Sequence, residues 1–344
     1  MNLRCFRFDL PFKYPFTTAR GTKTHQPAFV VELEHFGLKG YGEAPAIAYY
    51  NIPVEQMVED LRAKKTVVEK YAFQEPERFW HFLHHLFPNN NFLVCALDMA
   101  AWDLYGKMRN QPLHQLWGLK TDNNPVTDYT IGMDTIEKMV EKMQAQPWPV
   151  YKVKMGWEND MEMIRALRQH TTAPMRVDVN SGWTVAEALE KIPQLKELDI
   201  EFVEEPIERF NYEGMKQIFP HSPLPLFADE SCVLEKDVEQ CAGAFHGINI
   251  KLTKCGGITP ARRMIEKARS LDMKVMTGCM NESTIGSAAI AHLLPLLDYA
   301  DMDGPLLLNE DLATGITIKN GVVGYSGGAG LGIEFTRTEA ESLI

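Results

Sequence analysis

The sequence predicts an α/β fold in which a parallel β/α barrel follows a smaller α+β unit. Strand and helix patterns alternate from about residue 125 onward, whereas the first ~115 residues lack this alternation. Five charged residues also recur at nearly even intervals, and they are Lys154, Asp178, Glu204, Asp229 and Lys251. Their separations of 24 (178−154), 26 (204−178), 25 (229−204) and 22 (251−229) residues are about the length of one strand–loop–helix–loop unit. If each residue ends a successive strand, the five side chains meet at one mouth of the barrel.

The length, composition and charge limit the classes of protein to which the chain can belong. Its 344 residues favour two domains, or one large barrel with an appendage, and an apolar fraction of 45% is ample for a sizeable core. The net charge of −11 argues against nucleic acid and against an anionic membrane surface, because both are polyanions. No apolar run approaches the roughly 20 residues of a membrane span. We therefore expect no nucleic-acid partner and no membrane partner.

Two features of the sequence favour a cytoplasmic protein. Residues 1–7 open with charges and alternation, and they lack the apolar core of a signal peptide. The six cysteines are scattered without a C-x-x-C pair, which argues against a zinc site and against a disulfide framework. Reduced thiols are the better interpretation.

The N-terminal unit is expected to combine an antiparallel sheet with helices. Residues 28–34 are rich in β-formers, and the glycine-containing segment 36–40 supplies a turn into the next strand. Helical patterns follow over about 54–71, from Pro76 onward, and over about 92–108. Together these elements predict an α+β unit of about 115 residues.

The rest of the chain shows repeated strand and helix patterns. Short strands are expected at 126–132, 150–155, 175–180, 201–205, 225–228, 247–252, 273–278 and 298–302. Amphipathic helices lie between most of them, and about eight such units close a barrel. Pro193 interrupts the helical stretch 184–198, so we expect a kink there or a different helix boundary. Near the end of the chain, Asn320-Gly321 predicts a hairpin turn whose strands rejoin the N-terminal sheet.

The three acids of the evenly spaced set offer only oxygen ligands. Side chains on a strand alternate between its faces, so Asp178 and Asn180 share the inward face while the valines beside them pack outward. Glu204 and Asp229 follow on the next two strands, with no histidine or cysteine in register. Oxygen triads, completed by water and a substrate carboxylate, suit Mg²⁺ better than zinc. The alternative is that each acid merely caps a helix at its strand end, which is less plausible for three consecutive strands.

The two lysines of the set flank the acids, so Lys154 and Lys251 should approach a bound substrate from opposite sides. To act as a base near neutral pH, a lysine needs a pKa well below its usual value of about 10.4. Lys152 shares a strand face with Lys154, and its like charge and that of the metal would lower the pKa of its neighbour. Such lysines could remove and return an α-proton, while a metal-held carboxylate stabilises the enediolate. The alternative is that they only form salt bridges with the acids.

These residues, in this order, resemble the enolase superfamily, in its muconate-lactonizing-enzyme-like subgroup. The resemblance covers essentially the whole chain, and the motifs are specific jointly rather than singly. They are the helix Ala96–Leu104, Lys152-x-Lys154, Asp178-x-Asn180, Glu204-Glu205-Pro206, Asp229-Glu230-Ser231 and Lys251-Leu252-x-Lys254-x-Gly256-Gly257.

The resemblance implies a capping domain at residues 1–118, a modified TIM barrel, (β/α)₇β, at 119–305, and a C-terminal segment at 306–344 that returns to the capping domain. It implies Mg²⁺ held by Asp178, Glu204 and Asp229. It further implies that Lys154 and Lys251 form the acid/base pair that abstracts an α-proton from a carboxylate substrate. Relatives often assemble, so a homo-oligomer is expected.

One motif distinguishes activities within the subgroup. Asp301 and Asp303 share a face of the predicted eighth strand and can both meet a cation at the barrel mouth. The family's dipeptide epimerases carry an Asp-x-Asp at this place that binds the substrate's α-ammonium. The alternative is a loop of solvated acids. Lys152 and Glu282 are further candidates for contact with the substrate, although Glu282 could equally cap a helix.

The remaining candidates surround the site. Arg20 lies in the capping-domain loop that covers the site in relatives, where it could bind a side-chain carboxylate of the substrate or be an ordinary surface arginine. A second covering loop is expected near 46–53, which contains Tyr49 and Tyr50. Asn180 and Glu230 are expected to support the metal ligands.

The sequence therefore favours a Mg²⁺-dependent dipeptide epimerase that acts on L-Ala-D/L-Glu or a related dipeptide as its small-molecule partner. An o-succinylbenzoate synthase, an N-acylamino acid racemase or a muconate cycloisomerase would keep the same site, but their substrates lack an ammonium for the acid pair. A non-catalytic descendant with a structural or binding role is a third possibility. The preferred dipeptide and the oligomeric state stay open.

Overall fold

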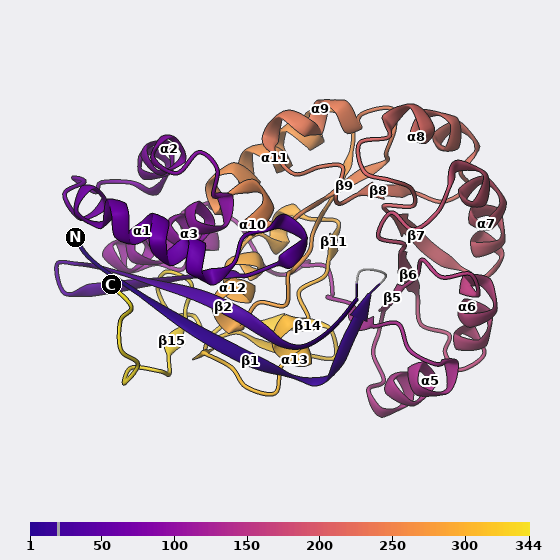
Figure 1. The fold of residues 1–344 in the computed structure, drawn as a ribbon, viewed down its shortest axis with the longest axis horizontal. Helices are drawn as coiled ribbons and strands as arrows, with labels where there is room; N and C mark the ends of the chain where they lie inside the picture. The colour runs from indigo at the N-terminus through magenta and orange to yellow at the C-terminus, as the bar shows by residue number, and fades with distance from the viewer. Residues whose placement is uncertain (19–20) are drawn as a thin grey trace.

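The computed structural model describes residues 1–18 and 21–344, and it has the α/β fold that the sequence predicts (Figure 1). An N-terminal antiparallel sheet with its helices lies beside a curled parallel sheet that is surrounded by further helices. Among the described residues, no helix is both long enough and apolar enough to cross a membrane.

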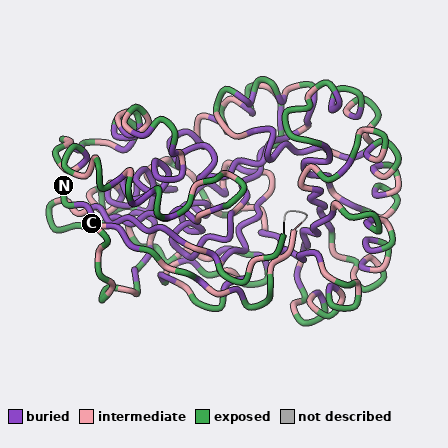
Figure 2. Tube along the Cα trace, viewed as in Figure 1, coloured by how far each residue is buried: buried purple, intermediate pink, exposed green. Residues whose placement is uncertain are grey.

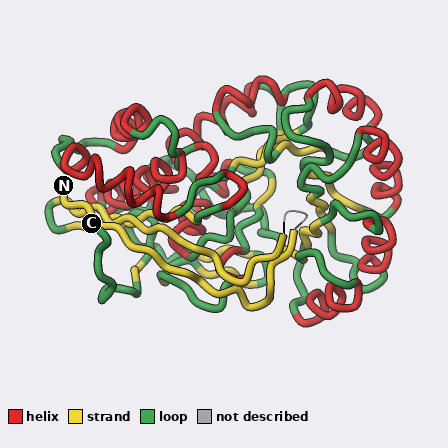
Figure 3. The backbone as a smooth tube through the Cα atoms, in the orientation of Figure 1, coloured by secondary structure: helices red, strands yellow, loops and turns green. Residues whose placement is uncertain are grey.

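The N-terminal sheet is a three-stranded antiparallel meander. Its strands are β1 (Asn2–Thr18), β2 (Gly21–His35) and β3 (Leu38–Pro45). The first two strands form a long hairpin, with Asn2 opposite Glu34 at its base. This hairpin extends from the sheet towards β5 and β6 of the barrel (Figures 1 and 3). The N-terminal unit therefore reaches the barrel by a pair of extended strands.

Helices cover one face of this sheet. They are α1 (Val54–Glu69), α2 (Pro76–Leu86), α3 (Asn91–Arg109) and α4 (Leu113–Leu116), preceded by a 3₁₀ turn at Ala48–Tyr50. Helix α3 approaches β3 so closely that only glycine fits at two strand positions. A Cβ at Gly40 would lie 2.1 Å from the Ala100 carbonyl oxygen, and one at Gly42 would lie 2.0 Å from that of Ala96. The two glycines thus allow the backbone of α3 to pack directly against the backbone of β3.

Eight parallel strands form the curled sheet, in the order of the chain. They are β4 (Tyr129–Ile131), β5 (Tyr151–Lys154), β6 (Met175–Asp178), β7 (Ile200–Glu204), β8 (Leu226–Ala228), β9 (Gly247–Ile250), β10 (Lys274–Thr277) and β11 (Tyr299–Ala300). Each falls within its predicted range or one residue from it. A parallel bridge between Thr127 and Ala300 joins the two ends of the sheet, which closes the barrel.

Helices follow the strands on the outside of the barrel. They are α5 (Ile136–Ala145), α6 (Asp160–Arg168), α7 (Val185–Glu197), α8 (Tyr212–Ile218), α9 (Val238–Cys241), α10 (Leu252–Cys255), α11 (Ile258–Ser270), α12 (Thr284–Ala291) and α13 (Gly304–Leu307), with 3₁₀ turns at Phe219–His221, Glu235–Asp237 and Leu294–Leu296. Pro193 lies inside the continuous helix α7, whose ends are within one residue of the prediction.

A charged and aromatic cluster fills the interior of the barrel below its mouth. The Arg176 guanidinium forms ion pairs with Asp128 (2.9 Å) and Glu201 (2.8 Å). It also lies 5.5 Å from the ring centre of Phe202 and 4.9 Å from that of Tyr299. This packing fills the interior at this depth, and the large pocket formed by the described residues lies at the mouth.

The C-terminal region contains short strands. They are β12 (Ala313–Thr314), β13 (Thr317–Lys319), β14 (Val322–Gly324) and β15 (Glu334–Phe335). The turn at Asn320-Gly321 is confirmed, because both residues have a positive φ and join β13 to β14. These two strands form a sheet of their own, however, rather than joining β1–β3. Phe335 instead stacks on Tyr41 of β3, with ring centres 4.9 Å apart.

Two buried carboxylates of the N-terminal unit bind the N-termini of barrel helices. Asp98 of α3, which is buried along most of its length (Figure 2), accepts hydrogen bonds from the Thr259 amide (2.9 Å) and hydroxyl (2.7 Å) in α11. Glu43 of β3 accepts hydrogen bonds from the amides of Ser283 and Gly286, both at 3.0 Å, beside α12. Burial raises the pKa of each carboxyl to about 7. These contacts connect elements that lie far apart in the sequence.

Candidate active site

The five evenly spaced residues meet at the carboxyl ends of consecutive barrel strands, as their spacing predicts. Lys154, Asp178 and Glu204 are the last residues of β5, β6 and β7, and the register places Asp178 directly between the other two. Asp229 and Lys251 come immediately after β8 and β9. Parallel strands end at one edge of the barrel, so all five side chains share that mouth.

Three buried carboxylates form the centre of the site. Asp178, Glu204 and Asp229 each offer an oxygen atom, and these atoms lie within 4.8 Å of one another. Their side chains are at most 2% exposed. Three acids packed this closely repel one another and require cations nearby.

Lysine amines provide this countercharge. Lys152 Nζ lies 2.8 Å from Glu204 Oε2 and 3.3 Å from Asp178 Oδ2. Lys154 Nζ lies 2.5 Å from the same Asp178 oxygen, and Lys251 Nζ lies 2.7 Å from Asp229 Oδ2. Burial alone would raise the pKa values of Asp178 and Asp229, but these neighbouring lysines hold both below the ordinary value. Burial and the charge of Asp178 raise the pKa of Glu204 to about 7.

The donor set fits Mg²⁺. Each of the three acids contributes oxygen, and no histidine or cysteine belongs to this group among the described residues. Oxygen ligands around a six-coordinate Mg²⁺ are about 3–4 Å apart, which three groups within 4.8 Å of one another can reach with small adjustments. Asp229 also lines the pocket, so the acids lie next to a space that could hold a substrate carboxylate and water.

Two side chains that the sequence interpretation gave no role hold these acids in place. Asn249 on β9 donates a hydrogen bond from Nδ2 to Glu204 Oε1 (2.7 Å). Lys254 in α10 is buried, and its Nζ lies 2.5 Å from Asp229 Oδ1. Asn249 lies two residues before Lys251, so strand alternation places both side chains on the inward face. This alternation is the signal that could have identified Asn249.

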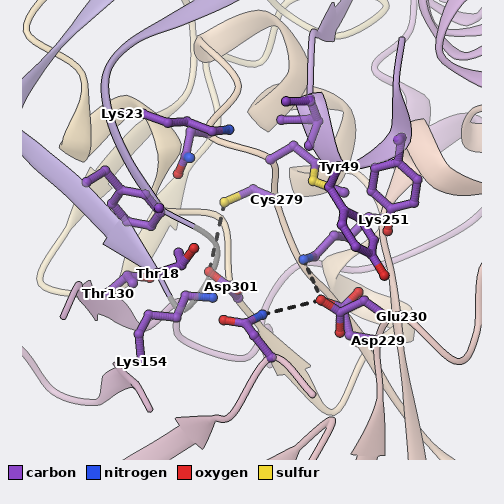
Figure 4. Close-up of a pocket in the computed structure, with 18 of the residues that line it drawn as sticks. Thr18, Lys23, Tyr49, Thr130, Lys154, Asp229, Glu230, Lys251, Cys279 and Asp301 are labelled. Carbon is purple, nitrogen blue, oxygen red and sulfur yellow. Dashed lines mark hydrogen bonds and ion pairs between the residues drawn. The ribbon is translucent and has the colours of Figure 1, made fainter. Parts of the chain in front are cut away.

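The two flanking lysines enter the pocket from opposite sides (Figure 4). Lys154 comes from β5, whereas Lys251 comes from the end of β9 beside Asp229. The lowered lysine pKa that is expected beside Lys152 and a bound metal stays a prediction. At Lys251 the charges of the protein itself act in both directions. Burial lowers its pKa and the charge of Lys152 acts in the same direction, but Asp229 and Glu204 raise the pKa well above the ordinary value. A cation held by Asp229 and Glu204 would oppose this upward shift.

Asp301 and Asp303 form a second acidic pair at the mouth, after β11. Both are buried, and each has an oxygen within 4.8 Å of the other and of Cys279 Sγ. Asp301 Oδ2 binds Lys152 Nζ (2.7 Å), while Asp303 Oδ2 accepts a hydrogen bond from the Thr130 amide (2.6 Å). Burial and the charge of Asp301 raise the pKa of Asp303 to about 7. The pair can accept a cationic group from the pocket.

The other predicted site residues lie at different depths. Asn180 and Glu230 line the pocket beside Asp229, with Asn180 Nδ2 at 3.4 Å from Glu230 Oε1. Glu282 is buried, and its carboxylate accepts a hydrogen bond from the Met280 amide (2.6 Å). Met280 itself lines the pocket, so Glu282 supports the wall from behind. Arg20 lies outside the described residues.

The pocket above these groups has a volume of about 510 Å³. Its floor is the barrel mouth, and its roof comes from the β1–β2 hairpin and the segment 47–50 of the N-terminal unit. Apolar side chains of the roof include Phe16, Ile47 and Tyr50, which face the polar floor. A small polar molecule could be enclosed between the two units.

Comparisons with known proteins agree with this architecture. Residues 2–118 match the family described as mandelate racemase / muconate lactonizing enzyme, N-terminal domain, and residues 134–340 match the family described as enolase C-terminal domain-like. A curated relative, the L-Ala-D/L-amino acid epimerase of Flavobacterium johnsoniae, is 49% identical over 97% of this chain and 99% of its own length.

Two solved structures resemble the whole chain. One is a substrate-liganded complex of the L-Ala-D/L-Glu epimerase from Bacillus subtilis, with a TM-score of 0.92, 28% identity, and coverage of 97% of this chain and 98% of that chain. The other is a dipeptide epimerase from Cytophaga hutchinsonii complexed with Mg and D-Ala-L-Val, with a TM-score of 0.91, 28% identity, and coverage of 98% and 96%. On the family matches and this identity, the chain belongs to the mandelate racemase / muconate lactonizing enzyme family of the enolase superfamily.

Proposed function

We propose that this protein is a Mg²⁺-dependent dipeptide epimerase, an isomerase that inverts the α-carbon of the C-terminal residue by removing a proton from one face and adding a proton to the other. The observation that carries the proposal is the position of Lys154 and Lys251 on opposite sides of one pocket, directly above three carboxylates. Inversion of a stereocentre requires an acid and a base on its two faces. The family and the epimerase relatives support the same reaction.

Asp178, Glu204 and Asp229 would hold the metal. Bound there, Mg²⁺ supplies positive charge next to the substrate carboxylate, which acidifies the adjacent C–H bond and stabilises the charge that develops as the proton leaves. Asn249 and Lys254 keep the acids oriented through their bonds to Glu204 and Asp229. Ordered ligands of this kind reduce the reorganisation needed at the moment of reaction.

The lysines move the proton. One amine, neutral at Nζ, removes the α-proton on its side of the substrate, and the other, as an ammonium, donates a proton from its Nζ to the opposite face. The roles exchange when the other epimer is bound. Lys152 stays protonated through its ion pairs with Glu204 and Asp301. Its side chain is fully buried beneath the mouth, so it would favour a bound carboxylate through its charge.

Asp301 and Asp303 bind the α-ammonium of the dipeptide in this proposal. Both residues line the pocket, where Asp301 Oδ1 and Asp303 Oδ1 lie 3.9 and 3.6 Å from Cys279 Sγ. Figure 4 shows Asp301 between Lys154 and Asp229. An ammonium between two buried carboxylates forms charge-assisted hydrogen bonds that a neutral acyl group cannot replace. The substrate is thus L-Ala-D/L-Glu or a related dipeptide with a free N-terminus.

We also propose the organisation in which this reaction takes place. Residues 1–118 form the capping domain, 119–305 the catalytic barrel, and 306–344 the segment that returns to the cap, supported by the hydrogen bond from the Leu343 amide to the Cys5 carbonyl (2.9 Å). The protein acts in the cytoplasm as a homo-oligomer, on a small-molecule substrate without nucleic-acid or membrane partners.

The direct test is incubation of the purified protein with Mg²⁺ and L-Ala-L-Glu in deuterated water, followed by proton NMR. We expect loss of the α-proton signal of the C-terminal residue and appearance of the other diastereomer. The absence of exchange across a panel of dipeptides would contradict the proposal. Calorimetric titration with Mg²⁺ then distinguishes two reasons for a lack of exchange. An epimerase tested with the wrong dipeptides should still bind Mg²⁺, whereas a non-catalytic descendant would take up no Mg²⁺ in the presence of a dipeptide.

A further inference from the structure

A second cavity lies outside the barrel mouth, between the β1–β2 hairpin and helix α5. Its charged and phenolic side chains are Lys13 and Tyr14 of β1, Tyr129 of β4 and Lys142 of α5, and we call it the lateral cavity. Its volume of about 160 Å³ equals that of about five water molecules, so a small ion fits with water around it. The proposed reaction gives none of these four residues a role.

The backbone of β1 is irregular where it reaches this cavity. The pairing of β1 with β2 changes register between Pro11 and Phe16. Such an irregularity bends a strand and changes the direction of its side chains. Figure 1 shows the hairpin bending on its way to the barrel. Lys13 and Tyr14 lie inside the irregular segment, so the bend brings them to the side of the barrel.

The ammonium groups at the lateral cavity have little countercharge. Lys142 Nζ lies 3.1 Å from Asp134 Oδ2, but the other oxygen of this carboxylate lies 3.5 Å from Lys138 Nζ. Lys13 Nζ donates a hydrogen bond to the Leu306 carbonyl (2.8 Å), and it forms no ion pair with a carboxylate of the described residues. Positive charge is thus in excess at this place, although the protein as a whole has a net charge of −11.

Tyr129 provides an independent sign that a ligand is bound here. Its side chain lines the lateral cavity and is only 9% exposed, and its hydroxyl forms no hydrogen bond with any residue that the structure describes. Burial raises its pKa to about 12, with smaller contributions from Asp303 and Tyr14, so the hydroxyl keeps its proton at neutral pH. A buried donor without an acceptor is unfavourable, and an anion in the cavity would supply the acceptor.

The negative groups around the cavity are already engaged elsewhere. The C-terminus of α5 carries partial negative charge, but the Met143 and Gln146 carbonyls accept hydrogen bonds from the Tyr151 hydroxyl at 3.2 and 3.0 Å. Asp303 accepts a hydrogen bond from the Thr130 amide (2.6 Å) in the active-site pocket. These contacts leave the two lysines and the phenol to determine what the cavity binds.

We propose that the lateral cavity is a second ligand site, which binds a phosphate group through Lys13, Lys142 and the Tyr129 hydroxyl. The three donors come from three different elements of the fold. A tetrahedral phosphate offers charged acceptor oxygens in several directions, whereas the two oxygens of a carboxylate lie in one plane. The ligand is free phosphate or a phosphate monoester. This proposal does not depend on the epimerase function.

A phosphate at this site would connect the two units of the molecule. Lys13 belongs to the hairpin and Lys142 to the barrel. Phe16, three residues after Lys13, lines the active-site pocket. Phe16 and Thr130 also line a narrow cavity of about 30 Å³ that shares all four polar residues of the lateral cavity. Binding would therefore hold the hairpin in place over the active site, which makes the lateral cavity a regulatory site.

The test is equilibrium dialysis of the purified full-length protein against radioactive inorganic phosphate, with a chelator to remove metal ions. For the wild type we expect saturable binding of one phosphate per chain. Lys13→Met and Lys142→Met should each weaken it by about 10-fold or more, because each removes a charge-assisted hydrogen bond. Tyr129→Phe removes only the hydroxyl and should weaken it by about 3- to 10-fold.

Lys138→Met is the matched control. Lys138 lies on the same helix and shares Asp134 with Lys142, but its side chain is 63% exposed and does not line the lateral cavity. Its replacement should change the affinity for phosphate by less than about threefold. Thermal unfolding checks the fold of every variant, and Lys142→Gln is a second neutral replacement if Lys142→Met does not fold.

Hydrogen exchange of residues 12–18 tests the connection between the hairpin and the barrel. Phosphate should slow exchange of these amides in the wild type and leave it unchanged in Lys142→Met. Because phosphate stabilises proteins generally, only the difference between the two proteins measures the site. Unaltered exchange in the wild type would overturn the regulatory role.

The remaining outcomes decide the site itself and the source of its ligand. Tighter binding of glycerol 3-phosphate than of inorganic phosphate would support a phosphate monoester as the ligand, and the reverse order would support free phosphate. Absence of saturable binding, or equal affinity in the wild type and in the Lys13 and Lys142 variants, would overturn the proposal. None of these measurements uses a dipeptide, so the epimerase assignment stands or falls separately.

Discussion

Two groups of buried carboxylates differ in what surrounds them. Glu43 and Asp98, at the contact between the N-terminal unit and the barrel, accept hydrogen bonds from backbone amides and hydroxyls of helix N-termini. The acids of the barrel mouth are surrounded by lysine amines instead. Burial raises the pKa of both interface acids, whereas the lysines lower the pKa values of Asp178 and Asp229.

This difference indicates that the interface acids have a structural role and that the acids of the barrel mouth have a chemical role. Backbone donors are fixed by the fold, so the interface acids hold two helices in one position. A lysine amine, in contrast, can lose a proton and regain it. Carboxylates that are compensated by such amines form a site that can accept a divalent cation and release lysines for proton transfer.

The largest expected effect comes from the lysines of the mouth. Lys154→Ala and Lys251→Ala should each reduce epimerisation by about 10²- to 10⁴-fold, because each removes the acid or base on one face of the substrate. Each variant should still exchange the α-proton of one epimer with deuterated water, through the lysine that remains. NMR of both L-Ala-L-Glu and L-Ala-D-Glu measures this. A variant that interconverts the epimers at the wild-type rate would show that the two lysines are not the acid/base pair.

The interface acids should show the opposite pattern. Asp98→Ala leaves the buried donors of Thr259 without an acceptor, and we expect it to lower the free energy of unfolding by about 2–4 kcal/mol. Its kcat/KM at a temperature where it is folded should stay within about threefold of the wild type, because the contact is remote from the pocket. Urea denaturation and the exchange assay measure the two quantities.

An exposed contact across the same interface provides the control. Arg262 and Glu77 form an ion pair of 3.3 Å between α11 and α2, with side chains that are 31% and 59% exposed. Glu77→Ala should cost at most about 1 kcal/mol, since exposed pairs are screened by solvent. Equal losses from Asp98→Ala and Glu77→Ala would contradict the structural role given to the buried acid.

The sequence predicts the residues of the barrel mouth better than the contacts between the N-terminal unit and the barrel, for a physical reason. Lys154, Asp178 and Glu204 end consecutive strands, and strand alternation with regular spacing is a local property of the chain. The partners of Asp98 lie 161 residues away, and their meeting depends on how α3 packs on the barrel. Nothing in the local pattern around Asp98 contains that information.

Inside the site, the sequence could not predict how the charges balance. The spacing gathers the lysines and the acids, but the pKa of Lys251 depends on its distances to Asp229, Glu204 and Lys152, and in the structure the two carboxylates outweigh the like charge. Strand alternation could have pointed to Asn249, but its bond to Glu204, like the bond of Lys254 to Asp229, joins separate elements and depends on how they pack. The spacing in the sequence identifies which charged residues lie together, whereas the direction of each pKa shift depends on the distances between them in the folded protein.

A smaller effect on turnover is expected for the acidic pair Asp301 and Asp303, and it should distinguish the role of this pair from that of the metal ligands. Asp303→Asn keeps the shape of the side chain but removes a charge, so turnover of L-Ala-L-Glu should fall by about 10- to 100-fold. N-acetyl-L-Ala-L-Glu has no ammonium, and its slow exchange should be unaffected by the variant. Mg²⁺ affinity, measured by calorimetry, should also be retained. An equal loss for both compounds would favour an N-acylamino acid racemase and remove the ammonium-binding role.

The smallest effect concerns pH, and it tests the two groups of acids against each other. The pKa of Glu43 is raised by burial to about 7, so its protonated form is favoured in the folded protein more than in the unfolded chain. Its contribution to stability is therefore present below the unfolded value of about 4.5 and is lost as the pH rises to about 7. For Asp178, whose pKa is lowered by Lys154, the contribution is present above about 3.8 and is lost on acidification below that value. The two groups thus act in different pH windows and with opposite signs.

Glu43→Gln removes the titrating group at the interface. The variant should be less stable than the wild type, because an amide presents donors to the Ser283 amide, but its stability should change less between pH 5 and pH 8. We expect the difference in slope to amount to about 1–2 kcal/mol over this range. Midpoints of urea unfolding at several pH values measure it, with Mg²⁺ excluded by a chelator so that the mouth contributes equally to both proteins. Parallel profiles for the two proteins would mean that Glu43 is already charged in the fold, and that backbone donors alone stabilise a buried carboxylate as well as lysines do.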